Sequence, residues 1–325
     1  MSPNMDRRGF VKKSILASAG GAAMINGADA AQPDAGKITV NVNSKATVPQ
    51  GKIGDLKISR MLLGGNLLTH YTHSRDLQYV YRLTANYNTE EKIFETMALA
   101  EAHGVNALVI HNPPGIIPML LKYRHHQGKM QYIVCPTATI AADMKEYSEQ
   151  VKSLVDNGID AIYLWGVRSD QLVAQGRMDL VRQAVEIARD CGVPSGIGAH
   201  DLRVVVECEK HGISSDFYIK TFHHHNYPTA PKPDELTGAY SEIPGYWCKD
   251  PNETIEVMSK VEKPWIAFKV MAAGTIPPRD AFTYVFEKGA DHTLAGMFDF
   301  EIAEDVKIVN EVLAGLKNRT RPWYS

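Results

Sequence analysis

The feature that most constrains the fold of this chain is an alternation of short apolar runs with amphipathic segments, which repeats about eight times from residue 51 onward. The apolar runs are typical of β-strands, and the segments between them carry apolar residues at helical spacing. Several runs lack a polar face, as expected for parallel strands covered by helices. No GxGxxG motif follows the first predicted strand, which argues against a Rossmann fold. We therefore expect an α/β fold, a (β/α)8 TIM barrel spanning 52–318.

The predicted elements follow directly from this alternation. Strands are predicted at 59–65, 106–112, 131–136, 159–166, 194–200, 215–222, 263–270 and 292–297. Helices are predicted at 89–104, 115–128, 144–158, 178–192, 202–212, 251–261, 278–289 and 301–316. The polar residues 31–51 are expected to form a linker, and residues 319–325 a C-terminal tail.

The first thirty residues differ from the rest of the chain. A basic stretch, MDRRGFVKK, precedes the mildly apolar SILASAGGAAMI and the small-x-small sequence at 28–30. The arginine pair, followed by a large apolar residue and a lysine, resembles the twin-arginine export motif. The alternative is an ordinary amphipathic N-terminus. We expect a signal peptide at 1–30, the twin-arginine export machinery as a partner, and a periplasmic or otherwise exported destination.

Composition excludes two classes of partner. The formal net charge is -2, so the chain has no basic excess that would attract nucleic acid. No apolar run reaches the ~18 residues that a membrane span needs. The four cysteines show no CxxC pairing, and we expect buried free thiols.

The order of segments resembles the aldo/keto reductase superfamily over residues 52–316. GDLKISRMLLGGN resembles the opening hairpin and first strand of that family, and AHGVNALVIH, NGIDAIYLWG and CGVPSGIGAHD resemble later strand segments. IAFKVMAAG and LAGMFDFEIAEDVKIV resemble its last two strand ends. The resemblance implies a TIM barrel and, as one possible activity, carbonyl reduction with NADP.

The catalytic tetrad of that family is not matched. Its Asp, Tyr, Lys and His positions correspond here to Val109, Pro114, Pro136 and Trp165. The Tyr/Lys pair supplies a proton during hydride transfer, so ordinary reduction by that route is not expected. The stretch GMFDFEIAED also places carboxylates where such reductases often offer basic residues to the cofactor phosphate.

Polar residues stand instead at the expected carboxyl ends of the strands, where TIM barrels carry their chemistry. Two imidazoles and a carboxylate form a common site for a divalent metal ion. We expect metal ligands among His111, His200, His223, His225 and Asp201, with Asp299 as another possible oxygen ligand. The expected catalytic groups are His111, His200 and Lys269, with Lys269 or Lys220 stabilising an anion or carrying a proton.

Each of these assignments has an alternative. Asp201 could cap a helix beside a packed His200, and the histidine run at 223–225 could be a solvated loop. His73, His103 and the pair at 125–126 are expected to have no role in the site. Strand alternation leaves open which side Lys220 faces, and we favour the inside of the barrel.

Two long loops, at 66–88 and 226–252, suggest the class of substrate. They carry many aromatic side chains together with Arg and Glu, a combination that suits a sugar, although the rings could also serve only to pack the loops. The expected substrate contacts are Asn66, His70, Trp165, Lys220, Tyr246 and Trp247.

These observations together predict an exported enzyme that acts on a carbohydrate or similar small polar substrate by metal-assisted acid/base chemistry, as an isomerase, epimerase, lyase or hydrolase. One alternative is an NAD(P)-dependent oxidoreductase of aldo/keto reductase type with a non-standard active site. Another is a non-catalytic carbohydrate-binding barrel.

Overall fold

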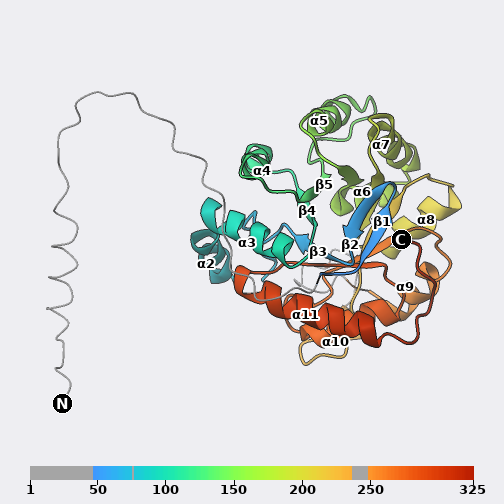
Figure 1. Ribbon diagram of the computed structural model, residues 1–325. Coiled ribbons are helices and arrows are strands. Elements are labelled where there is room, and N and C mark those ends of the chain that lie inside the picture. Colours follow the sequence, from blue (N-terminus) through green and yellow to red (C-terminus); the bar gives the residue numbers. More distant parts are fainter. Residues whose placement is uncertain (1–46, 75–76, 236–247) are drawn as a thin grey trace, which may run out of the picture. The chain divides into compact units, whose positions relative to one another are not determined.

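The structure of the chain is a computed structural model that describes residues 47–74, 77–235 and 248–325 (Figure 1). The predicted signal peptide, most of the predicted linker, and the predicted substrate residues Tyr246 and Trp247 lie outside the described residues. In the described part of the chain, no helix is long and apolar enough to cross a membrane.

Eight parallel strands close into a barrel in sequence order, with the last strand pairing with the first. The strands are β3 (Met61–Gly64), β4 (Ala107–His111), β5 (Gln131–Cys135), β6 (Ala161–Leu164), β7 (Ser195–Ala199), β8 (Phe217–Thr221), β9 (Trp265–Phe268) and β10 (His292–Ala295). Each lies within its predicted range, because a strand covered on both faces must be apolar throughout. The prediction of a (β/α)8 barrel is confirmed.

Helices surround the strands, with α10 and α11 on one side of the barrel and α5 and α7 on the opposite side (Figure 1). They are α2 (Tyr79–Tyr87), α3 (Glu90–Ala102), α4 (Ile116–His125), α5 (Lys145–Asp156), α6 (Gly166–Ala174), α7 (Met178–Asp190), α8 (Leu202–Lys210), α9 (Pro251–Met258), α10 (Pro278–Glu287) and α11 (Asp299–Gly315), with a 3-10 turn at Pro233–Glu235. Two of these, α2 and α6, were not predicted. Helix α6 begins at a glycine without a capping side chain, so its sequence carries no start signal.

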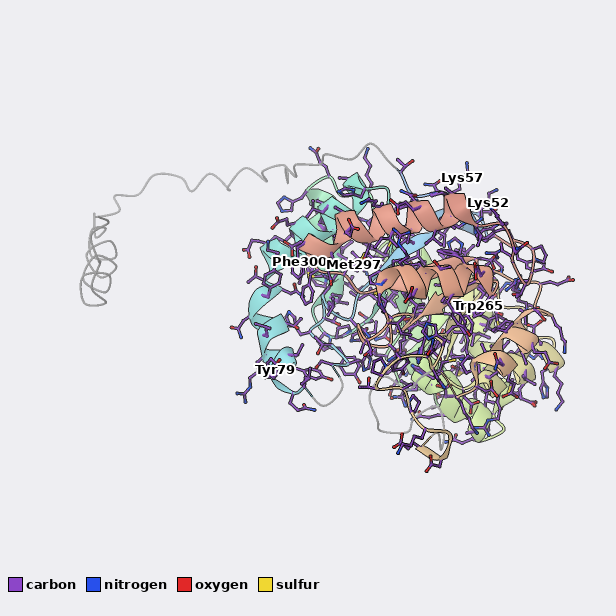
Figure 2. The ribbon with its side chains drawn as sticks, turned by 90° about the horizontal axis from the view of Figure 1, so that it is seen from below. Lys52, Lys57, Tyr79, Trp265, Met297 and Phe300 are labelled. Carbon is purple, nitrogen blue, oxygen red and sulfur yellow. The ribbon has the colours of Figure 1, made fainter. Side chains whose placement is uncertain are left out.

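An antiparallel hairpin closes the amino-terminal end of the barrel. It consists of β1 (Gln50–Ile53) and β2 (Leu56–Ser59), and its Ile53 and Ile58 are fully buried. Both pack in one cluster with barrel-interior residues, including Phe217 and Ile266. Figure 2 shows the hairpin residues Lys52 and Lys57 near one end of α11, and Met297 and Phe300 near the other. Chemistry is therefore left to the carboxyl ends of the strands.

Candidate active site

A buried aspartate–histidine pair stands at the carboxyl end of β7. His200 directly follows the strand, and its Nδ1 lies 2.8 Å from Oδ2 of Asp170, a residue of α6. The Asp170 carboxylate also accepts the backbone N–H groups of His200 and Asp201, at 3.2 and 3.0 Å. Only 8% of the His200 side chain and 1% of the Asp170 side chain are exposed. Three donors therefore hold this carboxylate, and it in turn holds the imidazole ring.

Two glycines allow α6 to approach β7 closely enough for this pair to form. A Cβ atom at Gly198 would lie 2.8 Å from the nitrogen of Gly166 and 3.0 Å from the carbonyl oxygen of Leu164. The Ser169 hydroxyl bonds to the carbonyl oxygen of Gly198 and so ties the helix to the strand. The position of Asp170 therefore depends on a close backbone contact that a larger residue would obstruct.

Burial and charge act in opposite directions on His200. Burial lowers the pKa of His200, while the hydrogen bond and charge of Asp170 raise it. An ionised carboxylate can only accept hydrogen bonds, so we assign the proton of neutral His200 to Nδ1. The second ring nitrogen, Nε2, is then the atom that can take up or release a proton at a substrate.

Lys269 follows β9 and adopts a backbone conformation that is unusual for a lysine. Its φ angle is 58°, in the left-handed region that side chains other than glycine rarely enter. Its Nζ lies 5.9 Å from the centre of the Phe268 ring, and burial lowers the pKa of Lys269 to about 7. Strained backbone and a strongly perturbed pKa both occur preferentially at functional sites.

His73 joins this group from the loop between β3 and α2. Burial, with a smaller contribution from nearby Lys269, His200 and His111, lowers the pKa of His73 to about 3. Its φ angle of 47° is again in the left-handed region. Tyr71 packs edge-on against His73 and His111, with ring centres 4.6 and 5.8 Å apart. The site therefore unites groups from the ends of β4, β7 and β9 with the loop after β3.

Sequence reasoning missed two members of this site. His73 was expected to have no role, and Asp170 was not considered because α6 was not recognised. The expected catalytic residues His111, His200 and Lys269 do lie in one region, since each is close enough to His73 to lower its pKa. The only sequence signal for His73 was its place in an unusually long rim loop.

The predicted metal ligands, in contrast, point to different partners. His225 Nε2 bonds to the carbonyl oxygen of Cys248 at 2.9 Å, and Asp201 caps α8 and pairs with Arg203. His223 is fully buried, and burial lowers its pKa to about 3. The described residues contain no group of three or more His, Cys, Asp or Glu side chains that could hold a metal ion. The predicted ligand set is therefore not assembled, and the capping role of Asp201 is confirmed.

The histidine run at 223–225 is likewise not a solvated loop. The strand β8 places Phe217 and Ile219 in the barrel interior, so His223 follows on the inner side by alternation. His224 packs edge-on against Tyr284 at 5.0 Å, outside that interior. His224 therefore turns away from its two neighbours, while the rings of His223 and His225 lie with their centres 5.9 Å apart.

Lys220 does not face the barrel interior, and that prediction is wrong. It alternates with Phe217 and Ile219, which puts it on the helix-facing side with Tyr218 and Phe222. Its Nζ donates to the carbonyl oxygen of Thr221 at 2.8 Å and to the Thr221 hydroxyl at 3.0 Å.

The other predicted substrate contacts have mixed positions. His70 Nε2 bonds to the carbonyl oxygen of Asn88 at 3.0 Å, which ties the rim loop to the start of α3. Trp165 and Asn66 are partly buried where β6 and β3 end. Asp299 bonds to the hydroxyl of Tyr87 at 2.6 Å and to Lys92 at 3.1 Å, so it is engaged at the start of α11.

Comparisons with known proteins agree on the fold. No protein-family model and no curated protein match the sequence. Two solved structures of proteins from Pseudomonas aeruginosa described as aldo-keto reductases match with TM-scores of 0.56 and 0.54, at 15% and 17% identity; each match covers 83% of this chain and 98% of the other. The holo form of an aldo-keto reductase from Bacillus halodurans matches with a TM-score of 0.51 at 11% identity, over 83% and 97% of the two chains. This chain folds as an aldo-keto reductase-like barrel.

In this aldo-keto reductase-like barrel, the positions that correspond to the family's tetrad carry no acid–base group. Val109 is 4% exposed among the interior residues, and Trp165 stands at the start of α6. Pro114 and Pro136 follow β4 and β5 in loops. At the carboxyl ends of the strands, which form the mouth of the barrel, the titratable groups described above are instead Asp170 with His200, and Lys269 with His73 and His111.

The fold raises the question of whether the mouth could hold a nicotinamide dinucleotide. After β9, Ala272, Ala273 and Gly274 have successive positive φ angles of 46°, 59° and 82°. Neither the Ala273 nor the Gly274 N–H donates to another residue in the described ranges. Exposed backbone N–H groups in such a turn suit an anion, and a pyrophosphate would fit this donor set. The first turn of α11 carries Asp299 and Glu301 and does not suit a further phosphate.

Proposed function

We propose that this chain is a nicotinamide-dependent oxidoreductase that interconverts a carbonyl and a hydroxyl group, with Asp170 and His200 in place of the usual tetrad. The observation that carries the proposal is the 2.8 Å bond between Asp170 and His200, made beside Lys269 at the catalytic end of the barrel. The likeness in fold to aldo-keto reductases supports the redox class.

In this proposal each residue of the site has a separate role in the transfer of hydride and proton. A bound nicotinamide would supply the hydride, with its pyrophosphate held by the backbone of Ala273 and Gly274. His200 Nε2 moves the proton to or from the substrate oxygen, while Asp170 keeps the ring in one tautomer. The Lys269 ammonium stabilises negative charge on that oxygen. The packed rings of Tyr71 and His111 line one side of the substrate site.

We propose a sugar or similar small polar compound as the substrate. Tyr71 is 50% exposed while its ring touches His111 and His73, so one aromatic face is available at the edge of the site. Such a ring can pack against the C–H face of a sugar. Export by the twin-arginine route remains part of this proposal and rests on the N-terminal sequence alone.

A second candidate function is proton transfer on a carbohydrate without a dinucleotide, as in an epimerase or lyase. The acidic first turn of α11 favours it, because Asp299 and Glu301 offer no counter-charge to a cofactor phosphate. His200 and Lys269 would then act as the base and the anion-stabilising group. The metal-assisted form of this chemistry draws no support from the described residues.

Dinucleotide binding separates the two candidates. We would titrate the purified protein with NADH and with NADPH, and follow nicotinamide fluorescence. Saturable binding that a bulky Gly274→Val substitution weakens at least about tenfold would support the redox proposal, since the substituted side chain strains the φ angle of 82°. Gly315→Val, at the distant end of α11, is the matched control. Absence of binding by both dinucleotides would favour the second candidate.

A further inference from the structure

Lys269 combines several features of a lysine that reacts with its substrate covalently. It stands at the carboxyl end of β9, where the mouth of the barrel lies; the residue is partly exposed, while its Nζ is buried. Its backbone is held in the left-handed region at a φ of 58°. The groups that it faces include His73 and His200, both of which are close enough for Lys269 to lower their pKa. Burial lowers its pKa to about 7, so much of the amine is unprotonated near neutral pH.

We infer that Lys269 forms an imine with a carbonyl substrate bound in the mouth of the barrel. The Nζ lone pair attacks the carbonyl carbon, a C–N bond forms, and the C=O π electrons move to oxygen, which takes a proton. Loss of this oxygen and of the two amine hydrogens as water then completes the C=N bond. No oxidant or reductant is consumed.

His200 is placed to serve this step. Formation of the carbinolamine and departure of water each require a proton to move between nitrogen and oxygen. His200 lies near enough for the charge of Lys269 to lower its pKa, and its Nε2 is the exchangeable position. A protonated imine also withdraws electrons from the neighbouring carbon, so the same His200 could remove the proton on that carbon. The site would then exchange or eliminate at that carbon as well as reduce.

Lys220 provides an internal comparison. It is also a buried lysine on a barrel strand, with 1% exposed, but it faces the helices and donates to Thr221. Both lysines lower the pKa of His200, but they differ in direction: Lys220 faces the helices and donates to Thr221, whereas Lys269 follows β9 at the mouth of the barrel.

The inference rests on the proposed function only in that both need a carbonyl compound in this mouth. The test uses the full chain, glyceraldehyde as the probe, and sodium borohydride to reduce any imine to a stable amine, with no dinucleotide present. Peptide mass spectrometry then locates the added mass. We expect labelling of Lys269 at least about tenfold above that of Lys220 and of the exposed Lys317.

Two variants sharpen the result. Labelling at this peptide should vanish in Lys269→Met and persist in Lys220→Met, while His200→Gln should slow it. Uniform labelling of surface lysines, or absence of labelling at Lys269 in the wild-type protein, would overturn the inference. Turnover that depends on a dinucleotide is measured separately and decides the proposed function. Reduction of a substrate by the dinucleotide without labelling of Lys269 would reject the imine alone. Labelling of Lys269 without dinucleotide binding would reject the redox role alone.

Discussion

At the scale of single residues, the candidate site depends on the pairing of one carboxylate with one imidazole. We expect Asp170→Asn to lower kcat/KM by about 10²–10⁴-fold, because an amide can donate to Nδ1 and so favour the wrong tautomer of His200. The measurement is steady-state turnover of the carbonyl substrate. Asp201→Asn is the matched control, since Asp201 caps α8 and an asparagine caps a helix about as well as an aspartate. Equal activity of Asp170→Asn and wild type would remove His200 from the proposed chemistry.

Lys269 illustrates a conflict between function and stability at a single position. Its pKa falls from 10.5 in the unfolded chain to about 7 in the folded chain. Between pH 7 and pH 10.5 the unfolded chain binds more protons than the folded chain. The contribution of Lys269 to the free energy of unfolding of the wild type therefore rises with pH over this range and is constant below about pH 7. We expect Lys269→Met to abolish turnover and yet to be more stable near pH 7, by roughly 1–3 kcal/mol.

Denaturant unfolding at several pH values tests this expectation. The stability gain of Lys269→Met over wild type should be largest below about pH 7 and should shrink as the pH approaches 10.5. Lys317→Met, which removes an exposed lysine, should show no such trend. A gain that is independent of pH would mean that burial does not depress the Lys269 pKa.

The residues that the sequence could and could not predict differ in one physical respect. His111, His200 and Lys269 were predicted because each ends an apolar strand, and strand ends in a barrel converge. His73 and Asp170 were missed because a loop and an unrecognised helix bring them to the site. The metal set failed for a different reason: the sequence shows which residues follow a strand, but not which way each side chain turns.

At the scale of elements, the contact between α6 and β7 positions the proton-transfer pair. A Cβ atom at Gly198 would clash with the backbone at 2.8 and 3.0 Å, and neither partner is a flexible side chain. We therefore expect Gly198→Ala to push α6 outward and to destabilise the fold by about 1–3 kcal/mol. It should also lower turnover and change the pH profile in the same way as Asp170→Asn. Thermal unfolding and kinetics provide the two readouts.

The control for this prediction is another glycine with free space around it. A Cβ atom at Gly315 would meet no atom within 4 Å, and the residue ends α11 far along the chain. Gly315→Ala should therefore leave both stability and turnover near wild-type values. If Gly198→Ala behaved in the same way, the close approach of α6 would not be needed to place Asp170.

Helix α2, which lies in the loop at 66–88, shows which elements hydrophobic periodicity fails to detect. Helix α2 was missed because its apolar residues Tyr79 and Leu83 are 66% and 61% exposed, so they do not mark a buried face. The eight strands were predicted because burial on both sides leaves a continuous apolar run. Periodicity thus detects elements that the core covers and overlooks those that it does not.

At the scale of the whole molecule, the two ends of the barrel have separate tasks. The mouth holds the titratable site, while the opposite end is closed by the β1–β2 hairpin and by the last residues of the chain. There Asp291 is fully buried and accepts the N–H groups of Trp265 and Tyr324, both at 2.9 Å. Arg319 and Arg321 lie 3.7 and 3.5 Å from its carboxylate, so this end is held by buried charges.

This separation predicts that stability and catalysis can be changed independently. We expect Asp291→Ala to cost about 3–5 kcal/mol of unfolding free energy, because it leaves buried arginines without their counter-charge. Folded Asp291→Ala should keep the wild-type KM and pH profile, measured well below its unfolding temperature. A shifted pH profile would show that the two ends of the barrel are coupled.

The measurement that tests the proposed function most directly is isotope transfer from a dinucleotide to a sugar. NADH or NADPH carrying deuterium at the reactive carbon would be incubated with an aldose and either the wild-type protein or Asp170→Asn, and the product analysed by mass spectrometry. We predict that deuterium enters the carbon of the former carbonyl group with wild type and at least about 100-fold more slowly with Asp170→Asn. Product free of deuterium with both dinucleotides, or equal transfer by the two proteins, would contradict an oxidoreductase built on Asp170 and His200.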